Sequence, residues 1–222
     1  MSATDDLRNA VIDGQARDAV SHTQHALEEG ISADELLQDG LMAAMREVGR
    51  LFEENEIYVP EMLVSAHAMK SSLEVLRPHL VRQEVKASGR IAIGTVEGDL
   101  HDIGKNLVAM MLQGAGFEVE DLGNDVYPQR FVEAAQRGAD VIAISALLTT
   151  TMTNMPSVID AIRAAGLRDR VRIVIGGAPI TQEYCDAIGA DGYAKTAASA
   201  VGMVQDVLGL AASTDGRAAT AR

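Results

Sequence analysis

The amino-acid sequence predicts two parts, an N-terminal four-helix bundle followed by an α/β domain with a parallel sheet. The first observation is that apolar residues recur at three- and four-residue spacing from about residue 4 to 84, which is typical of packed helices. The second is that short apolar strands and helices alternate from Arg90 onward. Five such strand–helix units in about 120 residues predict a five-stranded parallel sheet covered on both faces. That size fits a flavodoxin-like (Rossmann-type) fold with strand order 2-1-3-4-5.

The four helices of the first part have recognisable start signals. A short opening helix is expected near 5–12, and a second runs from about 16 to 28. Ser32 and Glu35 form a capping box before the third helix, because the serine can cap an amide while the glutamate reaches back. Pro60 suits the first turn of the fourth helix. Four methionines at helical spacing are expected as core filler: Met42, Met45, Met62 and Met69.

The second part alternates between strands and helices. Strands are expected at about 91–96, 117–122, 140–145, 172–175 and 191–194. Helices are expected at about 103–113, 128–136, 154–165, 181–188 and 197–210. A polar stretch over 83–90 indicates a linker, so we place the helical domain at 1–87 and the α/β domain at 88–212. The small polar tail, 213–222, is expected to be disordered.

Composition and charge exclude several classes of protein. The chain has 222 residues, of which 47 % are hydrophobic, enough for a packed core. Its 19 basic and 32 acidic residues give a formal net charge of -13, which disfavours nucleic acid and anionic membrane as partners. One cysteine excludes an intrachain disulfide, and the apolar runs are too short to span a bilayer. The polar, acidic start is unlike a signal peptide, so we expect a cytoplasmic protein.

The most informative feature is the run from Asp99 to Gly104, Asp-Leu-His-Asp-Ile-Gly, which follows the first predicted strand. In an open parallel sheet, ligands bind beyond the carboxyl ends of the strands, where the strand order switches. The segment after the third strand carries hydroxyls at 149–151, and the fourth strand is followed by Gly176 and Gly177. These three loops are expected to converge on one site. There, His101 can bind a metal through one ring nitrogen while Asp99 holds the other.

Other interpretations of the same residues stay open at this point. His101 alone is compatible with a surface or capping histidine, and Asp99 with a cap on the helix that follows. The run from Gly98 resembles a phosphate-binding loop, but five residues separate its glycines instead of four, and Asn106 replaces the required Ser or Thr. A phospho-accepting receiver domain has the same fold, but Ser145 stands where the acceptor aspartate belongs. Zinc is disfavoured because the other four histidines lie in the helical half at core or surface spacing.

Three motifs together resemble those of cobalamin-binding domains. The run Glu97–Asn106 is similar to the DxHxxG signature of that family. Ser145-Ala-Leu and the Gly176-Gly177 pair are similar to its second and third motifs, in the same order and at similar spacing. The helical half resembles the bundle that precedes this domain in methyl-transferring corrinoid proteins. The resemblance extends to about residue 212 and points to the small corrinoid proteins of methylamine and quaternary-amine methyltransferase systems, whose module methionine synthase shares.

The resemblance implies a cobalamin or related corrinoid bound base-off, with histidine on the metal. His101 would be the lower axial ligand of cobalt, in place of the cofactor's own dimethylbenzimidazole. Asp99 and Thr151 would complete a proton relay to that histidine, and the helical half would cover the upper face, with residues 58–62 close to it. Asp102 fits better as a helix-start residue. The full set of expected cofactor contacts is Gly98, Asp99, His101, Asp102, Ile103, Gly104, Ser145, Leu147, Thr149, Gly176, Gly177 and Ala178.

The function implied by the resemblance is that of a methyl carrier. A substrate-specific corrinoid methyltransferase would load a methyl group from a methylated amine or similar donor onto cobalt(I). A second methyltransferase would pass it to tetrahydrofolate or a thiol, with a reductive activase restoring cobalt(I). The chain would not act catalytically on substrate by itself. The alternatives are a cobalamin-dependent sensor or regulator, whose usual DNA-binding element is missing here, and the cobalamin-binding subunit of a mutase, against which the helical bundle argues.

Overall fold

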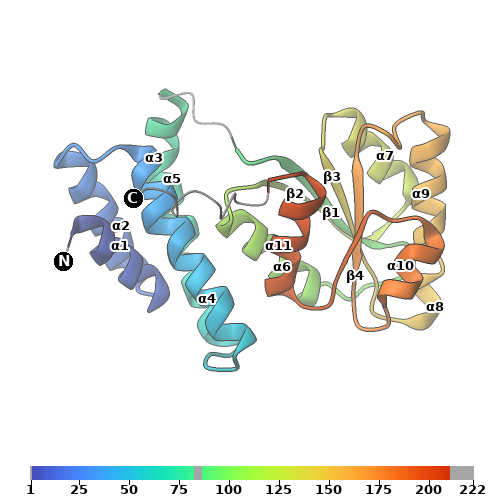
Figure 1. Ribbon diagram of the computed structural model, residues 1–222, viewed down its shortest axis with the longest axis horizontal. Helices are drawn as coiled ribbons and strands as arrows, with labels where there is room; N and C mark the ends of the chain where they lie inside the picture. The colour runs from blue at the N-terminus through green and yellow to red at the C-terminus, as the bar shows by residue number, and fades with distance from the viewer. Residues whose placement is uncertain (1, 83–86, 211–222) are drawn as a thin grey trace, which may run out of the picture.

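A computed structural model describes residues 2–82 and 87–210 of the chain. It shows a helical domain beside an α/β domain (Figure 1). Part of the predicted linker, 83–86, and the predicted disordered tail, 213–222, lie outside the described residues. No helix in the described ranges is both long enough and apolar enough to cross a membrane.

The helical domain is the predicted four-helix bundle. Its elements are α1 (Ala3–Ile12), α2 (Ala16–Glu28), a composite third helix made of α3 (Ala33–Glu35), η1 (Leu36–Met42) and α4 (Ala43–Glu53), and α5 (Val59–Arg82). Apolar side chains from these helices form one buried core, to which Leu7, Leu36, Leu41 and Leu76 contribute fully buried side chains. The four methionines predicted as core filler are all buried in it, which confirms that prediction.

The third helix departs from the regular helix that the spacing predicts. The Ser32 hydroxyl accepts a hydrogen bond from the Glu35 amide at 3.1 Å, which is one half of the predicted capping box. The next seven residues form the π-helix η1 before regular α-helix resumes at Ala43. Gly40 in η1 packs on α1 so closely that a Cβ there would lie 3.0 Å from Leu7 Cδ2. A π-turn of this kind shifts the face that a helix presents, which apolar spacing alone does not reveal.

The α/β domain has the predicted five-stranded parallel sheet, in the order β2-β1-β3-β4-β5. The strands are β1 (Arg90–Val96), β2 (Glu118–Val126), β3 (Val141–Ser145), β4 (Arg172–Gly176) and β5 (Gly192–Ala194). The helices are α6 (Ile103–Gly114), α7 (Pro128–Gln136), α8 (Thr149–Met152), α9 (Met155–Ala164), α10 (Gln182–Ile188) and α11 (Ala197–Val207). This is the flavodoxin-like topology that the alternation of elements predicts.

Two predicted boundaries in this domain differ by more than two residues from the structure, and one short helix was not predicted. Strand β2 continues to Val126 instead of ending near 122, because it pairs with β1 again after an irregularity. The hydroxyl-rich segment after β3 folds into the one-turn helix α8, which is too short to carry a periodic signal. Helix α11 ends at Val207 instead of 210, since Gly209 adopts φ +68° and turns the chain out of the helix.

Helices cover both faces of the sheet (Figure 1). Helices α7, α9 and α10 pack on one face around Phe131, while α6 and α11 pack on the other around Leu112. The helical domain lies against the outer side of α6 and α11 (Figure 1). Met111 of α6 is 4 % exposed and belongs to the bundle core, so the two domains share apolar contacts. Because β1, β3 and β4 are parallel, the loops that follow them lie at the same edge of the sheet.

Candidate functional site

The loop after β1 presents Asp99 and His101 at the carboxyl end of the sheet. Gly98 opens the loop with φ +82°, a conformation that favours glycine. The Thr95 hydroxyl donates a hydrogen bond to the His101 carbonyl at 2.9 Å, and the Asn154 amide donates to the Glu97 carbonyl at 2.8 Å. Sequence reasoning missed both of these supporting side chains. Their polar groups hold the loop backbone at two points, from β1 itself and from the start of α9.

Asp99 connects the histidine loop to the segment after β3. Its carboxylate has no exposed surface. One oxygen, Oδ1, accepts from the His101 ring nitrogen Nδ1 at 2.8 Å and from the His101 amide at 3.1 Å. The other, Oδ2, accepts from the Thr151 hydroxyl at 2.6 Å and from the Leu147 amide at 2.7 Å. Asp99 therefore does not cap the helix that follows it, and the structure brings together the predicted histidine, aspartate and hydroxyl.

The surroundings of Asp99 keep its carboxyl group ionised. Burial by itself raises the pKa of Asp99, but the hydrogen bonds from the Thr151 hydroxyl, the Leu147 amide and His101 outweigh it and hold that pKa well below its usual range. A carboxylate with this low pKa only accepts hydrogen bonds. Opposite such a carboxylate, His101 Nδ1 carries a proton and donates a hydrogen bond to Asp99.

The ring of His101 faces outward, with half of its side-chain surface exposed. Because Nδ1 is held by Asp99, Nε2 is the ring nitrogen that remains for a ligand. Exposed apolar side chains flank the histidine in sequence or lie on the loop that Asp99 binds: Leu100, Ile103, Leu147 and Leu148, at 69, 80, 43 and 42 % exposed. Four exposed aliphatic side chains on the histidine loop and on the segment that Asp99 binds offer apolar contacts to a ligand.

Beside His101, a cavity of about 440 Å³ enters the domain between the sheet and helices α6 and α11. Seven of the predicted contact residues line it: His101, Gly104, Ser145, Leu147, Gly176, Gly177 and Ala178. The deeper walls are apolar and small, for example Ala143, Val174 and Ala200. Protein interiors are close-packed, so an opening of this size into a domain core is expected to receive a ligand.

The remaining predicted residues lie outside this cavity. Asp99 and Thr151 are buried behind the histidine, and Gly98 forms the turn. Asp102 occupies the N-cap position of α6, in agreement with its interpretation as a helix-start residue. Ile103 stands on the exposed rim, and Thr149 begins α8. The predicted set therefore divides into residues of the cavity, residues of the rim and residues that support the histidine from below.

The glycine pair after β4 has a structural reason that the sequence did not reveal. Gly176 and Gly177 were expected as cofactor contacts, and both line the cavity. Gly177 adopts φ +127°, and a Cβ there would lie 1.8 Å from the Ala146 carbonyl oxygen. Glycine is thus required at 177 by the close approach of the β3 and β4 segments. That close approach also brings both loops to the mouth of the cavity.

Comparison with known proteins identifies the family. Residues 89–202 match the family described as B12 binding domain, and residues 3–77 match a second family with the same description. A corrinoid protein of Desulfitobacterium hafniense is 41 % identical over 213 residues, which cover 94 % of this chain and 99 % of that protein. The chain belongs to the corrinoid proteins with a B12-binding domain. Trimethylamine corrinoid protein 1 of Methanosarcina acetivorans is 43 % identical over 204 residues, covering 90 % of this corrinoid protein and 94 % of that relative.

A solved structure shows the same arrangement. The methanol:cobalamin methyltransferase complex MtaBC from Methanosarcina barkeri matches 93 % of this corrinoid protein and 80 % of the matched chain, with a TM-score of 0.83 and 30 % identity. The site fits the cofactor of the family in three respects: an outward imidazole nitrogen, an apolar rim, and a cavity into the sheet beside that nitrogen.

The helical domain of the corrinoid protein also reaches this site. We expected the stretch 58–62 near the upper face of the cofactor. Met62 is fully buried in the bundle core and Tyr58 is exposed, and the approach of this stretch to a bound cofactor stays a prediction. Phe52, near the end of α4, lines the cavity together with His101. An aromatic residue at the end of an amphipathic helix is indistinguishable in sequence from a core residue, so the sequence offered no signal for this contact.

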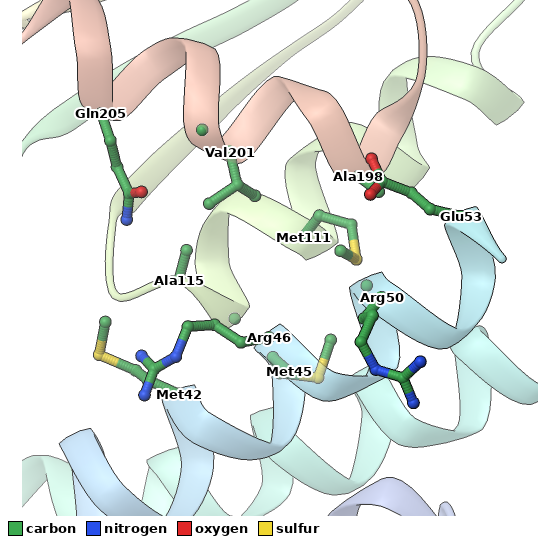
Figure 2. Close-up of a pocket in the computed structure, with 13 residues that line it drawn as sticks. Met42, Met45, Arg46, Arg50, Glu53, Met111, Ala115, Ala198, Val201 and Gln205 are labelled. Carbon is green, nitrogen blue, oxygen red and sulfur yellow. The ribbon is translucent and has the colours of Figure 1, made fainter. Parts of the chain in front are cut away.

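A second cavity of about 270 Å³ lies between the two domains of this corrinoid protein (Figure 2). Met42, Met45 and Arg46 line it from the third helix, with Met111 from α6 and Val201 from α11 on the opposite side (Figure 2). The domains therefore meet over a contact that is only partly filled. An interface of this kind resists relative movement less than a close-packed one.

Proposed function

We propose that this chain is a corrinoid methyl carrier. A substrate-specific methyltransferase would load the methyl group of a methylated amine onto its cofactor, and a second methyltransferase would deliver it to tetrahydrofolate or a thiol. A reductive activase would restore the cofactor after accidental oxidation. The proposal is supported by relatives named as trimethylamine and other corrinoid proteins and by the structural similarity to a methanol:cobalamin methyltransferase complex. The observation that carries it is the outward His101 ring at the mouth of the cavity between α6 and α11.

In this proposal, His101 would hold the cobalt of the cofactor through Nε2. Nδ1 is engaged by Asp99, so only Nε2 can face a ligand above the exposed apolar rim. The residues that line the cavity beside His101 would hold the nucleotide tail of the cofactor. When bound, the corrinoid supplies a cobalt centre that accepts a methyl group in its cobalt(I) form and gives it up to an acceptor.

Asp99 and Thr151 act on the proton of His101. An ionised Asp99 that accepts from Nδ1 fixes the tautomer and the orientation of the ring, which leaves the lone pair of Nε2 for a ligand. The same carboxylate stabilises the protonated ring whenever the histidine leaves the metal. The Thr151 hydroxyl, at 2.6 Å from Asp99, favours the charged carboxylate and thereby limits how far the proton shifts away from the ring. This chain of three side chains gives a ligand that can bind and release within one cycle.

The experiment that tests ligation is reconstitution with hydroxocobalamin, followed by the visible spectrum of wild type and His101→Ala. We expect both proteins to bind, with a spectrum of nitrogen ligation in the wild type only. His25→Ala is the control, because His25 is an exposed histidine on α2. If the wild type takes up no corrinoid, the proposed function is wrong. An unchanged spectrum in His101→Ala would show that another group binds the metal.

The carrier role is tested separately by methyl transfer. The reconstituted protein is reduced to the cobalt(I) state and mixed with a trimethylamine-specific methyltransferase and trimethylamine. We expect the cobalt(I) absorption to disappear only when both methyltransferase and donor are present. Loss of the signal without either component would point to simple oxidation, and no loss with a panel of methylated amines and methanol would exclude these donors.

A further inference from the structure

The end of strand β2 holds the histidine loop from the side opposite to Asp99. Gly94 pairs with Gly123 and Val96 pairs with Val126, so the single residue Thr95 on β1 faces two residues on β2. The extra residue is a β-bulge, a feature that re-aims side chains next to functional sites. Here the two residues of the bulge are Asn124 and Asp125, and both side chains turn toward the loop after β1.

Three hydrogen bonds join this bulge to three successive residues of the histidine loop. The Asp125 carboxylate oxygen Oδ1 accepts from the Gly98 amide at 2.7 Å. In return, the Asp125 amide donates to the Asp99 carbonyl at 3.0 Å. The Asn124 side-chain amide donates to the Leu100 carbonyl, also at 3.0 Å. The backbone on which His101 sits is therefore clamped immediately before the histidine, through groups that the Asp99 side chain does not use.

Asp125 adopts an unfavourable backbone conformation to make these bonds. Its φ is +52°, in the left-handed region that costs a residue with a side chain, although aspartate and asparagine tolerate it better than most. The residue is exposed, so burial of its side chain does not offset that cost. Strained residues persist where surrounding contacts demand them and are concentrated at functional sites. The contacts that demand this conformation are the two with Gly98 and Asp99.

We propose that Asp125 is a positioning residue for the axial histidine. Its hydrogen bonds fix the backbone at Gly98 and Asp99 and thereby the position and orientation of the His101 ring. Nε2 would then reach the metal without rearrangement of the loop. This inference rests on the proposed ligation by His101. The Asp99–Thr151 pair controls the proton of the ring, whereas Asp125 controls where the ring stands. Metal sites lose function when a ligand is displaced by about half an ångström, so a loose loop weakens ligation even with every ligand present.

Three variants separate the effect of the hydrogen bonds made by Asp125, which we call the clamp, from effects of its backbone conformation and of its charge. Asp125→Gly keeps the left-handed backbone accessible but removes the acceptor for the Gly98 amide. Asp125→Asn keeps both the backbone preference and an Oδ1 acceptor while it removes the charge. Asp169→Ala removes one exposed carboxylate between α9 and β4, away from the histidine loop, and serves as the charge control.

Each protein is labelled with nitrogen-15, loaded with hydroxocobalamin, reduced to the cobalt(II) state and examined by electron paramagnetic resonance. The nitrogen splitting that is scored is the doublet that an axial nitrogen-15 of the protein gives to the cobalt lines, which differs from the triplet of the cofactor's own nitrogen-14 base. We expect Asp125→Gly to bind corrinoid but to ligate histidine roughly tenfold more weakly, about 1.4 kcal/mol. Asp125→Asn and Asp169→Ala are expected to match the wild type. Amide exchange of residues 97–101 in the unloaded protein is expected to quicken in Asp125→Gly only, with exchange in α9 unchanged.

Full nitrogen splitting in Asp125→Gly overturns the proposal, as does equal loss in Asp125→Asn, which would assign the effect to charge. Asp125→Gly that folds but binds no corrinoid also contradicts it, because the cavity between α6 and α11 does not depend on the clamp. If the wild type itself shows no nitrogen splitting, the proposed ligation by His101 is wrong, and the role of Asp125 falls with it. If Asp125→Gly does not fold, the exchange of 97–101 in Asp125→Asn must equal that of the wild type, or the proposal is rejected.

Discussion

At the scale of single residues, the site depends on one buried carboxylate. Asp99 accepts hydrogen bonds on both oxygens from the His101 loop and from the segment after β3, so it joins two strand ends as well as orienting a ring. Replacing it by asparagine puts an amide donor opposite groups that are themselves donors. We expect Asp99→Asn to lower the free energy of unfolding of the unloaded protein by about 2–3 kcal/mol at pH 7. Urea denaturation measures this difference.

The same substitution predicts a pH dependence. The pKa of Asp99 is lower in the folded chain than in the unfolded one, so its stabilisation is complete above the unfolded value of about 4 and is lost as the pH falls toward the folded value. The stability gap between wild type and Asp99→Asn should therefore be constant from pH 6 to 8 and narrow below about pH 4. A gap that widens in acid would show that the carboxyl group is protonated in the folded protein at neutral pH.

Thr151 provides a separate residue-scale test. Its hydroxyl donates to Asp99 at 2.6 Å, and a hydrogen bond to the charged form of a carboxyl group lowers its pKa. Thr151→Val keeps the shape and removes the donor, so we expect the pKa of Asp99 to rise and the protein to lose about 1–2 kcal/mol of stability. Thr151→Ser keeps the donor and should behave as wild type. Carbon-13 NMR of the Asp99 carboxyl group follows the pKa directly, and an equal pKa in all three proteins would remove Thr151 from the relay.

The residues of this site differ in how far sequence could predict them. Asp99, His101 and Thr151 were predictable because each follows a strand whose apolar run is clear, and parallel strands end at one edge. Asp125 and Asn154 were not assigned a role, because their partners lie 27 and 57 residues away in the chain and are backbone groups. Every residue has a backbone amide or carbonyl, so the residue type at the partner position does not indicate such a hydrogen bond. The reason for glycine at 177 was also hidden, since it depends on the distance between two neighbouring strand ends.

At the scale of elements, the contact between the domains is made by methionines set against glycines. A Cβ at Gly114 of α6 would lie 2.8 Å from Met45 Cγ, and Met111 packs toward Gly49 of α4. We expect Gly114→Ala to destabilise the protein by about 1–3 kcal/mol through overpacking. The matched control is Gly202→Ala, in α11 on the same cavity, where a Cβ meets nothing within 4 Å. That variant should gain roughly 0.5–1 kcal/mol in helix propensity. Thermal denaturation of both variants measures whether each substitution raises or lowers the stability. Destabilisation by Gly202→Ala would mean that the cavity is closed in solution.

Element boundaries were predictable where periodicity was long and failed where it was short. Helix α7 begins and ends where the pattern predicts, because a proline opens it and the apolar spacing is regular. The one-turn helix α8 and the bulge in β2 span too few residues to show a period. The π-helix η1 (Leu36–Met42) was also missed. It changes the angle by which successive side chains turn about the helix axis, but the apolar residues keep the sequence spacing of an α-helix. The missed elements matter most for function, because α8 carries Thr151 and the bulge carries Asp125.

At the scale of the whole molecule, the chain consists of a rigid sheet edge and a helical domain that borders it. The edge holds His101 and the opening of the cavity, and the helical domain contributes Phe52 to its wall. The partly filled contact between the domains permits the helical domain to shift without disturbing the Asp99 network, which lies entirely in the α/β domain. In the proposed function, this separation lets different methyltransferases reach the upper face of the cofactor while its lower ligand stays in place.

The cavity between the sheet, α6 and α11 yields the last prediction, which concerns the stability of the whole molecule. A ligand that fills it should stabilise the folded state, and at a concentration of 100 times its Kd this amounts to about 2.7 kcal/mol, or roughly 5–10 °C in Tm. Hydroxocobalamin should give this shift, whereas cobinamide, which lacks the nucleotide tail, should give clearly less. Ala200 lies on the deep wall of the cavity, so Ala200→Leu should remove the advantage of hydroxocobalamin and leave the cobinamide shift intact. Differential scanning calorimetry of wild type and Ala200→Leu, each with hydroxocobalamin and with cobinamide, measures these shifts in Tm. Equal shifts from the two corrinoids in wild type, unaffected by Ala200→Leu, would place the tail elsewhere.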